Sequence, residues 1–174
     1  MKFKIFLFLI LAWSSVAGQD QKQKQIIEDS KEAKATFLSK DKDMSKFFGS
    51  SYGYVIFPNV GKGGIGVGGA TGNGTVYEKG KIVGMAKMTQ VSIGLQLGGQ
   101  SYSEVVFFET SKDLKRFKEN NIEFSAQVSA VAAASGASAN AKYVDGVAVF
   151  TIQKGGLMYE ASVGGQKFKY SPLK

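Results

Sequence analysis

Basic side chains near expected turns are the residues of this sequence whose type and spacing could support a chemical role. The turn or strand-end residues are Lys62, Lys79, Lys81, Lys154 and Lys167, and the residues of one expected helix are Lys112, Lys115 and Arg116. If several of these turns meet at one end of a sheet, their side chains form a cationic rim that can hold phosphate headgroups. The alternative is that turn lysines keep the edges of a sheet soluble.

The glycine-dense segment 61–74 contains a second pattern with chemical potential. GIGVGG at 64–69 matches the dinucleotide fingerprint G-x-G-x-x-G, and an overlapping match begins at Gly61. That fingerprint needs a strand before it and a helix that opens at it, whereas a hairpin is expected here. A phosphate loop needs Ser or Thr after Gly-Lys, and Lys62 is followed by Gly63. We therefore interpret these glycines as strand residues that allow close approach between layers.

The composition argues against an enzyme and against a metal site. The sequence has no histidine and no cysteine, which removes the commonest general base, the commonest metal ligands and every disulfide. The candidate carboxylates, each beside an expected turn or strand end, are Glu78, Glu104, Glu109, Asp145 and Glu160. Nothing in the sequence pairs them, and no calcium-loop pattern occurs. We expect no catalytic residue, no metal and no cofactor.

The charge balance is positive. The chain has 22 Lys and Arg against 14 Asp and Glu, a formal net charge of +8. Lys2 and Lys4 lie in the segment that we expect to be removed, so 20 basic residues remain against 14 acidic ones, a net +6. Such an excess suits anionic partners such as phospholipid headgroups, although lysines that simply face water would give the same total.

Residues 1–18 have the pattern of a secretory signal peptide. Lys2 and Lys4 form a basic start, an unbroken apolar run covers 5–13, and the small residues Ser15 and Ala17 suit a signal peptidase. The apolar run is far shorter than the roughly 20 residues that a membrane span needs. We expect residues 1–18 to be cleaved, residues 19–174 to form one domain, and the product to be periplasmic or secreted.

Helical periodicity predicts two helices near the start of this domain and one inside it. Residues 19–38 have a thin apolar stripe with the spacing 26, 30, 33, 37, which lies either on the protein's own sheet or on a membrane. A second helix is expected over 39–48, ending at Gly49. The internal helix is expected over 110–120, with Thr110 and Asp113 as a capping pair.

The rest of the domain is predicted to be strands. We expect strands at 52–57, 76–77, 82–97, 105–108, 124–141, 147–153, 157–163 and 167–170, with turns at 58–59, 71–75, 78–81 and 154–156. In 82–97, alternation places Val91 and Ile93 on the buried face and Gln90 on the other. The predicted fold class is α+β, with an antiparallel, glycine-rich sheet curled into a barrel, two N-terminal helices and one internal helix.

Several blocks of the sequence resemble the SYLF-domain family in their order and spacing. The blocks are SYGYVIFPNVGKGG at 51–64, VSIGLQLGG at 91–99, EVVFF at 104–108, the small-residue stretch 125–141, and VFTIQKGGL at 149–157. The resemblance extends from about Lys31 to Lys169. It implies a lipid-binding domain that occurs alone in bacterial envelope proteins and beside other modules in eukaryotic proteins of membranes and actin.

We therefore expect an exported protein that associates with anionic phospholipid or a membrane surface through its basic turns. No nucleic acid is expected as a partner, and no second module accompanies the domain, so actin linkage is not expected. The alternative is a structural or assembly protein of the envelope whose sheet binds a protein partner. A small outer-membrane barrel is a third interpretation, against which the amphipathic helices and the lack of aromatic girdles count.

Overall fold

The computed structural model describes residues 4–65, 67–93, 99–120, 130–155 and 165–173. The helices are α1 (Lys4–Lys40), α2 (Met44–Ser50), α3 (Ser111–Lys118) and the 3-10 helix η1 (Ala137–Asn140). The strands are β1 (Gly53–Ile65), β2 (Val67–Glu78), β3 (Lys81–Ile93), β4 (Gly99–Phe108), β5 (Ala130–Ala132), β6 (Val147–Gly155) and β7 (Gln166–Pro172). The predicted pair of N-terminal helices and the single internal α-helix are confirmed.

The described strands form one open sheet in the order β5-β6-β4-β1-β2-β3-β7. All neighbours are antiparallel except β5 and β6, which run parallel. The α+β class is therefore confirmed, but the expected barrel is wrong. Closure needs hydrogen bonds between the two edge strands, and in the described chain β5 pairs only with β6 while β7 pairs only with β3.

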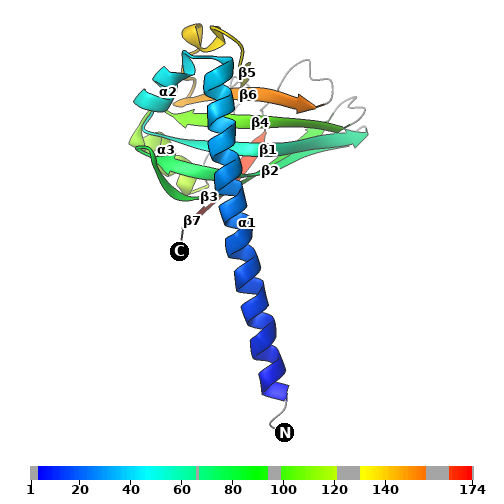
Figure 1. The fold of residues 1–174 in the computed structure, drawn as a ribbon. Coiled ribbons are helices and arrows are strands. Elements are labelled where there is room, and N and C mark those ends of the chain that lie inside the picture. Colours follow the sequence, from blue (N-terminus) through cyan, green and yellow to red (C-terminus); the bar gives the residue numbers. More distant parts are fainter. Residues whose placement is uncertain (1–3, 66, 94–98, 121–129, 156–164, 174) are drawn as a thin grey trace.

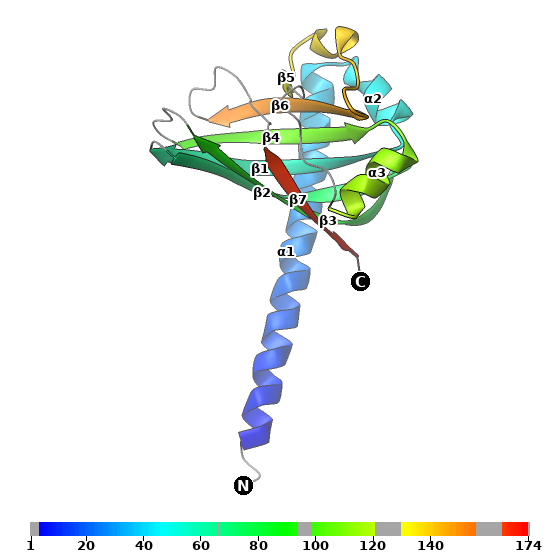
Figure 2. The ribbon, with the colours of Figure 1, turned by 180° about the vertical axis from the view of Figure 1, so that it is seen from behind.

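Both faces of the sheet are covered, so the domain has two apolar cores. Figure 1 shows α1 and α2 across one face, where Phe37 and Met44 pack on strand residues such as Phe107. Figure 2 shows α3 and β7 on the opposite face, where Leu114 and Phe168 help to enclose the second core. The central strand predicted over 105–108 is confirmed, because all four of its residues are fully buried.

Helix α1 lies across the strands and leaves the sheet on the side of β3 and β7, as both views show. Its inward stripe is Ser30, Ala33 and Phe37, each buried, at the helical spacing predicted from the sequence. Residues 20–25 are exposed all round the helix. The interpretation that the first helix packs on the protein's own sheet is confirmed for its C-terminal half. Within the described residues, no helix combines the length and the apolar character needed to span a bilayer.

Two expected turns lie inside long strands. Pro58 and Asn59 form an irregularity in β1, where its register with β2 and β4 shifts. The expected hairpin at 71–75 lies within β2, paired with β1 on one side and β3 on the other. The predicted turn at 78–81 is confirmed, and Lys79 and Gly80 adopt φ angles of 48° and 77° there, as such turns require.

The expected faces of β3 are reversed where the structure describes them. Val91 is 74% exposed and Gln90 only 4% exposed, because the even-numbered residues of β3 from Ala86 onward face the core that β7 covers. Side chains 92–98 lie outside the described residues.

The C-terminal half matches the expectations unevenly. The structure does not describe residues 121–129, which include the start of the strand expected over 124–141. Of the described remainder, β5 is a strand, and a turn at Gly136 (φ 75°) leads into η1. The strand expected over 147–153 is confirmed as β6 and the last strand as β7. The strand expected over 157–163 lies outside the described residues.

Candidate functional site

The basic residues predicted to form one rim are divided between the two ends of the sheet. At one end, where Gly53 pairs with Glu78 and Phe108, lie Lys79 and Lys81 of the β2–β3 turn and the α3 residues Lys112, Lys115 and Arg116. At the other end, where Gly63 pairs with Gly69 and Gly99, lie Lys62 and Lys154. Lys167 projects from β7, opposite Thr89. The structure therefore does not bring these eight side chains together.

Several cations of the α3 end have partners within the protein. Arg116 lies 3.6 Å from the carboxylate of Asp113, and Lys115 lies 3.7 Å from that of Glu119. The Lys79 ammonium lies 5.1 Å from the ring centroid of Tyr52. Such exposed ion pairs add little stability, but they offset the positive charge that this end presents to a partner.

Lys118 of the same helix, which the sequence analysis did not single out as a site residue, has a structural role. Its ammonium donates to the Glu78 carboxylate over 2.5 Å, and this bond ties α3 to β2. The same hydrogen bond holds the pKa of Glu78 below its ordinary value.

A closer group of cations lies on the strands themselves. Lys87 of β3 is directly opposite Lys169 of β7, and Lys167 lies two residues along β7 on the same side. All three side chains are exposed, and we call them the lysine face. Like charges directly opposite each other on neighbouring strands are destabilising. Among the described side chains of β2, β3 and β7 on this side, none is acidic.

Small polar residues continue the lysine face across the sheet. Lys87 is paired with Asn73 of β2, and its neighbour Thr89 is paired with Thr71. Thr71 is in turn opposite Gly61 of β1. These residues are exposed, so the three cations stand at one side of a floor of short side chains. Such a floor lets a flat or extended partner approach the backbone closely.

Where this floor meets α1, Lys154 belongs to a polar network. Its ammonium donates to Asn59 Oδ1 over 2.9 Å, and Asn59 Nδ2 donates to Asp29 Oδ2 of α1 over 3.1 Å. A cavity of about 210 Å³ beside this network is lined by Asp29, Glu32, Ala33, Thr36, Asn59, Ser103 and Lys154. Lys154 therefore helps to attach α1 to the sheet, a role that its position near a turn did not predict.

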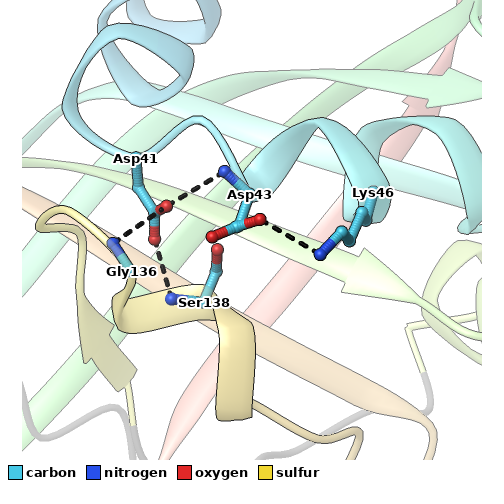
Figure 3. A network of polar contacts seen from close by, with 5 residues as sticks. All are labelled: Asp41, Asp43, Lys46, Gly136 and Ser138. Atoms are coloured by element: carbon cyan, nitrogen blue, oxygen red, sulfur yellow. Dashed lines mark hydrogen bonds and ion pairs between the residues drawn. The ribbon is translucent and has the colours of Figure 1, made fainter.

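Asp41 fixes the corner between α1 and α2, as Figure 3 shows. Its carboxylate accepts hydrogen bonds from the backbone N–H groups of Ser138 (2.7 Å), Asp43 (3.1 Å) and Gly136 (3.3 Å). Burial raises the pKa of the Asp41 carboxyl, but these bonds outweigh burial, and the pKa lies below its ordinary value. An ionised Asp41 thus links the helical layer to η1, nearly a hundred residues further along the chain.

The opposite face of the sheet contains a buried carboxyl group. Glu104 of β4 is fully buried, and Gln166 Nε2 donates to its Oε2 over 3.0 Å. Burial raises the pKa of Glu104 to about 7, although the bond from Gln166 opposes this shift. Burial, followed by the charge of Glu104, also raises the pKa of Tyr102, which lies beside it. In the part of the chain that the structure describes, no group of His, Cys, Asp and Glu side chains is arranged to hold a metal ion.

Comparison with known proteins supports the family resemblance. The family model Ysc84, described as "Las17-binding protein actin regulator", matches residues 89–171. The chain is also 28% identical over 131 residues to "Beta cell expansion factor A" of Aeromonas veronii, which covers 70% of this chain and 46% of that protein. The chain thus spans about half the length of this relative. The resemblance inferred from the sequence is confirmed: residues 89–171 of this chain match the model of the Ysc84 (SYLF) family.

Proposed function

We propose that this chain is an exported, non-enzymatic protein that binds anionic phospholipid at a membrane surface through the lysine face. The Ysc84 (SYLF) family is generally lipid-binding, which supplies the ligand class. The observation that carries the proposal is the direct pairing of Lys87 with Lys169, with Lys167 alongside. The sheet holds these three cations close together although the like-charge pair among them is destabilising. Binding to an anionic surface explains this arrangement.

The direction of α1 supports an orientation for this binding. The helix leaves the sheet on the side of β3 and β7, where the lysine face also lies. Its exposed segment 20–25 adds Lys22 and Lys24 to that side. We propose that this side faces the membrane, and that the basic residues of the β2–β3 turn and α3 make a weaker, secondary contribution because some of them already have intramolecular partners.

Vesicle flotation of the full chain tests this function. The wild type is expected to float with vesicles of phosphatidylglycerol in phosphatidylcholine and to dissociate as salt increases, because the Debye length shortens to about 3 Å at 1 M salt. Following only the salt-sensitive fraction separates this binding from any insertion of the apolar N-terminal segment. A lack of salt-sensitive binding to anionic vesicles would overturn the proposal.

Two matched triple variants locate the surface. Removing Lys87, Lys167 and Lys169 by alanine substitution is expected to weaken the salt-sensitive binding on the order of 100-fold, because each lysine near an anionic surface contributes about 1 kcal/mol. Alanine at Lys112, Lys115 and Arg116 removes the same charge and is expected to have a much smaller effect. Equal losses in the two variants would contradict the assignment to the lysine face.

A protein partner on the same floor is the second candidate. Val91, 74% exposed, lies at one end of the floor, and an apolar contact there suits protein better than headgroups. In that case Val91→Ser is expected to abolish capture of the partner while leaving vesicle binding unchanged. Full chain that captures a defined envelope protein, but no anionic vesicles, would favour this candidate over the first.

A further inference from the structure

Strand β7 presents opposite chemistry on its two faces. Lys167 and Lys169 are exposed on one face, whereas Gln166 and Phe168 are buried on the other. In the described residues, the strand partner of β7 is β3, and the Tyr170 N–H of β7 donates to Asn120 Oδ1. Its buried side chains therefore determine how firmly the two lysines are held against the sheet.

The buried contacts of β7 reach far across the sheet. The Phe168 ring lies 5.8 Å from that of Phe57 on β1 and 5.3 Å from that of Phe117 on α3. The Gln166 amide reaches β4, where it donates to Glu104. This bond is a polar contact between β7 and the middle of the sheet, and both of its partners are fully buried.

Glu104 has few groups nearby that could compensate a negative charge. Its cross-strand partners are Phe57 on β1 and Thr151 on β6, and its Oε1 atom has no hydrogen-bond partner among the described atoms. The described ionisable groups on this face of β4 and β1 are Tyr102 and the half-buried Lys62, while the lysines of β7 point to the opposite face. An ionised carboxylate in such surroundings is costly unless it is paired.

We propose that Glu104 is a positioning residue for the lysine face. While its carboxyl group is neutral, Glu104 holds Gln166 in place, and through Gln166 it holds β7. The consequence of this inference for membrane binding rests on the proposed function, whereas the effect of Glu104 on β7 does not. As a neutral acid, Glu104 accepts the Gln166 bond without a buried charge. When it ionises, the charge favours water, and β7 must loosen to admit it.

The direction of the pH effect follows from the chemistry of the carboxyl group. Its pKa is raised to about 7 in the folded protein from an ordinary value of 4.5, so the closed form of β7 is favoured at low pH. Opening returns the Glu104 carboxyl to its ordinary pKa, so opening of β7 becomes about tenfold more favourable per pH unit between about pH 4.5 and pH 7. It levels off above pH 7, where the carboxyl is ionised in both forms.

Hydrogen exchange on the full chain between pH 4 and pH 9 tests the inference directly. Protection factors of the β7 amides are expected to fall about tenfold per pH unit between about pH 4.5 and pH 7 and to level off above pH 7, while those of β1 stay constant. Glu104→Gln keeps an oxygen acceptor for Gln166 and cannot ionise, so its β7 protection is expected to stay high at every pH. Glu109→Gln, at an exposed position, should behave like the wild type.

Gln166→Met gives a second test, which can be made even if the Glu104→Gln variant folds poorly. The Gln166 bond lowers the pKa of Glu104, so its removal is expected to extend the fall in β7 protection to higher pH before it levels off. Constant β7 protection in the wild type would overturn the inference. An equal fall in β1 and β7 protection would also overturn it, because an equal fall indicates global unfolding.

Vesicle flotation across the same pH range connects the two proposals. Salt-sensitive binding is expected to fall between about pH 4.5 and pH 7 in the wild type and to stay level in Glu104→Gln. If the full chain binds no vesicles at any pH, the proposed function fails, while the exchange of β7 still decides whether Glu104 positions the strand.

Discussion

Asp41 joins two parts of the chain through one carboxylate, and its environment differs sharply from that of its neighbour Asp43. Asp41 is almost fully buried and accepts three backbone hydrogen bonds. Asp43 makes an exposed ion pair with Lys46 at 3.0 Å. Exposed pairs contribute little to stability, whereas hydrogen bonds to a buried charge contribute more. The two residues therefore form a matched pair for mutation.

Asp41→Asn is expected to lower the free energy of unfolding by about 1–3 kcal/mol at neutral pH, and Asp43→Asn to change it by less than about 0.5 kcal/mol. Because the pKa of Asp41 is lowered from 3.8, its charge stabilises the fold above that pH. This stabilisation is lost as the pH falls through the folded-state value. Urea unfolding at pH 7 and at acid pH measures both effects, and a difference that persists unchanged in acid would contradict this account.

At single residues, the sequence identified the correct chemistry but not the correct grouping. The positive charges of Lys79, Lys154 and Lys167 were recognised, yet the three lie at different places on the sheet. The alternation of Lys87 and Thr89, and of Lys167 and Lys169, signals one exposed face on each strand. That the two faces meet depends on the register between β3 and β7, which side-chain alternation alone does not specify.

At the scale of elements, the glycines of the sheet govern how closely strands and side chains approach. A Cβ added at Gly84 of β3 would lie 2.6 Å from the Ser171 carbonyl oxygen and against the Tyr170 ring, both on β7. A Cβ at Gly61 of β1 would meet nothing within 4 Å. Gly84 is therefore required by packing, and Gly61 is not.

Gly84→Ala is expected to destabilise the fold by about 1–3 kcal/mol through overpacking, and Gly61→Ala by less than about 1 kcal/mol. Because the strain falls on β7, Gly84→Ala should also weaken the salt-sensitive vesicle binding of the lysine face. Thermal unfolding and flotation of both variants check this. Equal effects would show that β-strand propensity, and not the contact with β7, determines the result.

The elements that could be predicted are those whose signals are local. In α3, the Thr110 side chain accepts from the Asp113 N–H and the Asp113 carboxylate accepts from the Thr110 N–H, which is the capping box read from the sequence. The expected hairpin at 71–75 failed because its Asn73-Gly74 pair resembles a turn. A Cβ at Gly74 would lie 2.5 Å from the Ile56 carbonyl oxygen, so this glycine serves strand packing, which is a non-local cause.

At the scale of the whole molecule, the described members of both cores lie outside the predicted signal peptide. Among the side chains that the structure describes, the buried residues of α1 begin at Ser30, and residues 20–25 are exposed. A chain that begins at Gln19 is therefore expected to unfold within about 2 °C of the full chain in a reversible thermal scan, a shift that corresponds to less than about 1 kcal/mol. A larger decrease would mean that the apolar segment 5–13 contributes to the fold.

The α+β class could be predicted from the mixture of periodicities, because period two and the helical period are local properties of the sequence. The barrel could not, since closure depends on whether the first and last strands in the sheet meet. Here the short β5 and the strand β7 remain at opposite edges. The same dependence on distant partners explains why the buried face of β3 was assigned incorrectly at Val91.

The contact of Asp41 with Gly136 and Ser138 also has a kinetic consequence. These residues are separated by 95 and 97 positions, and folds rich in such distant contacts form slowly because long loops must close first. During synthesis, the first helix has no complete partner until η1 and β6 have left the ribosome. We therefore expect the nascent chain to remain incompletely folded through most of its synthesis.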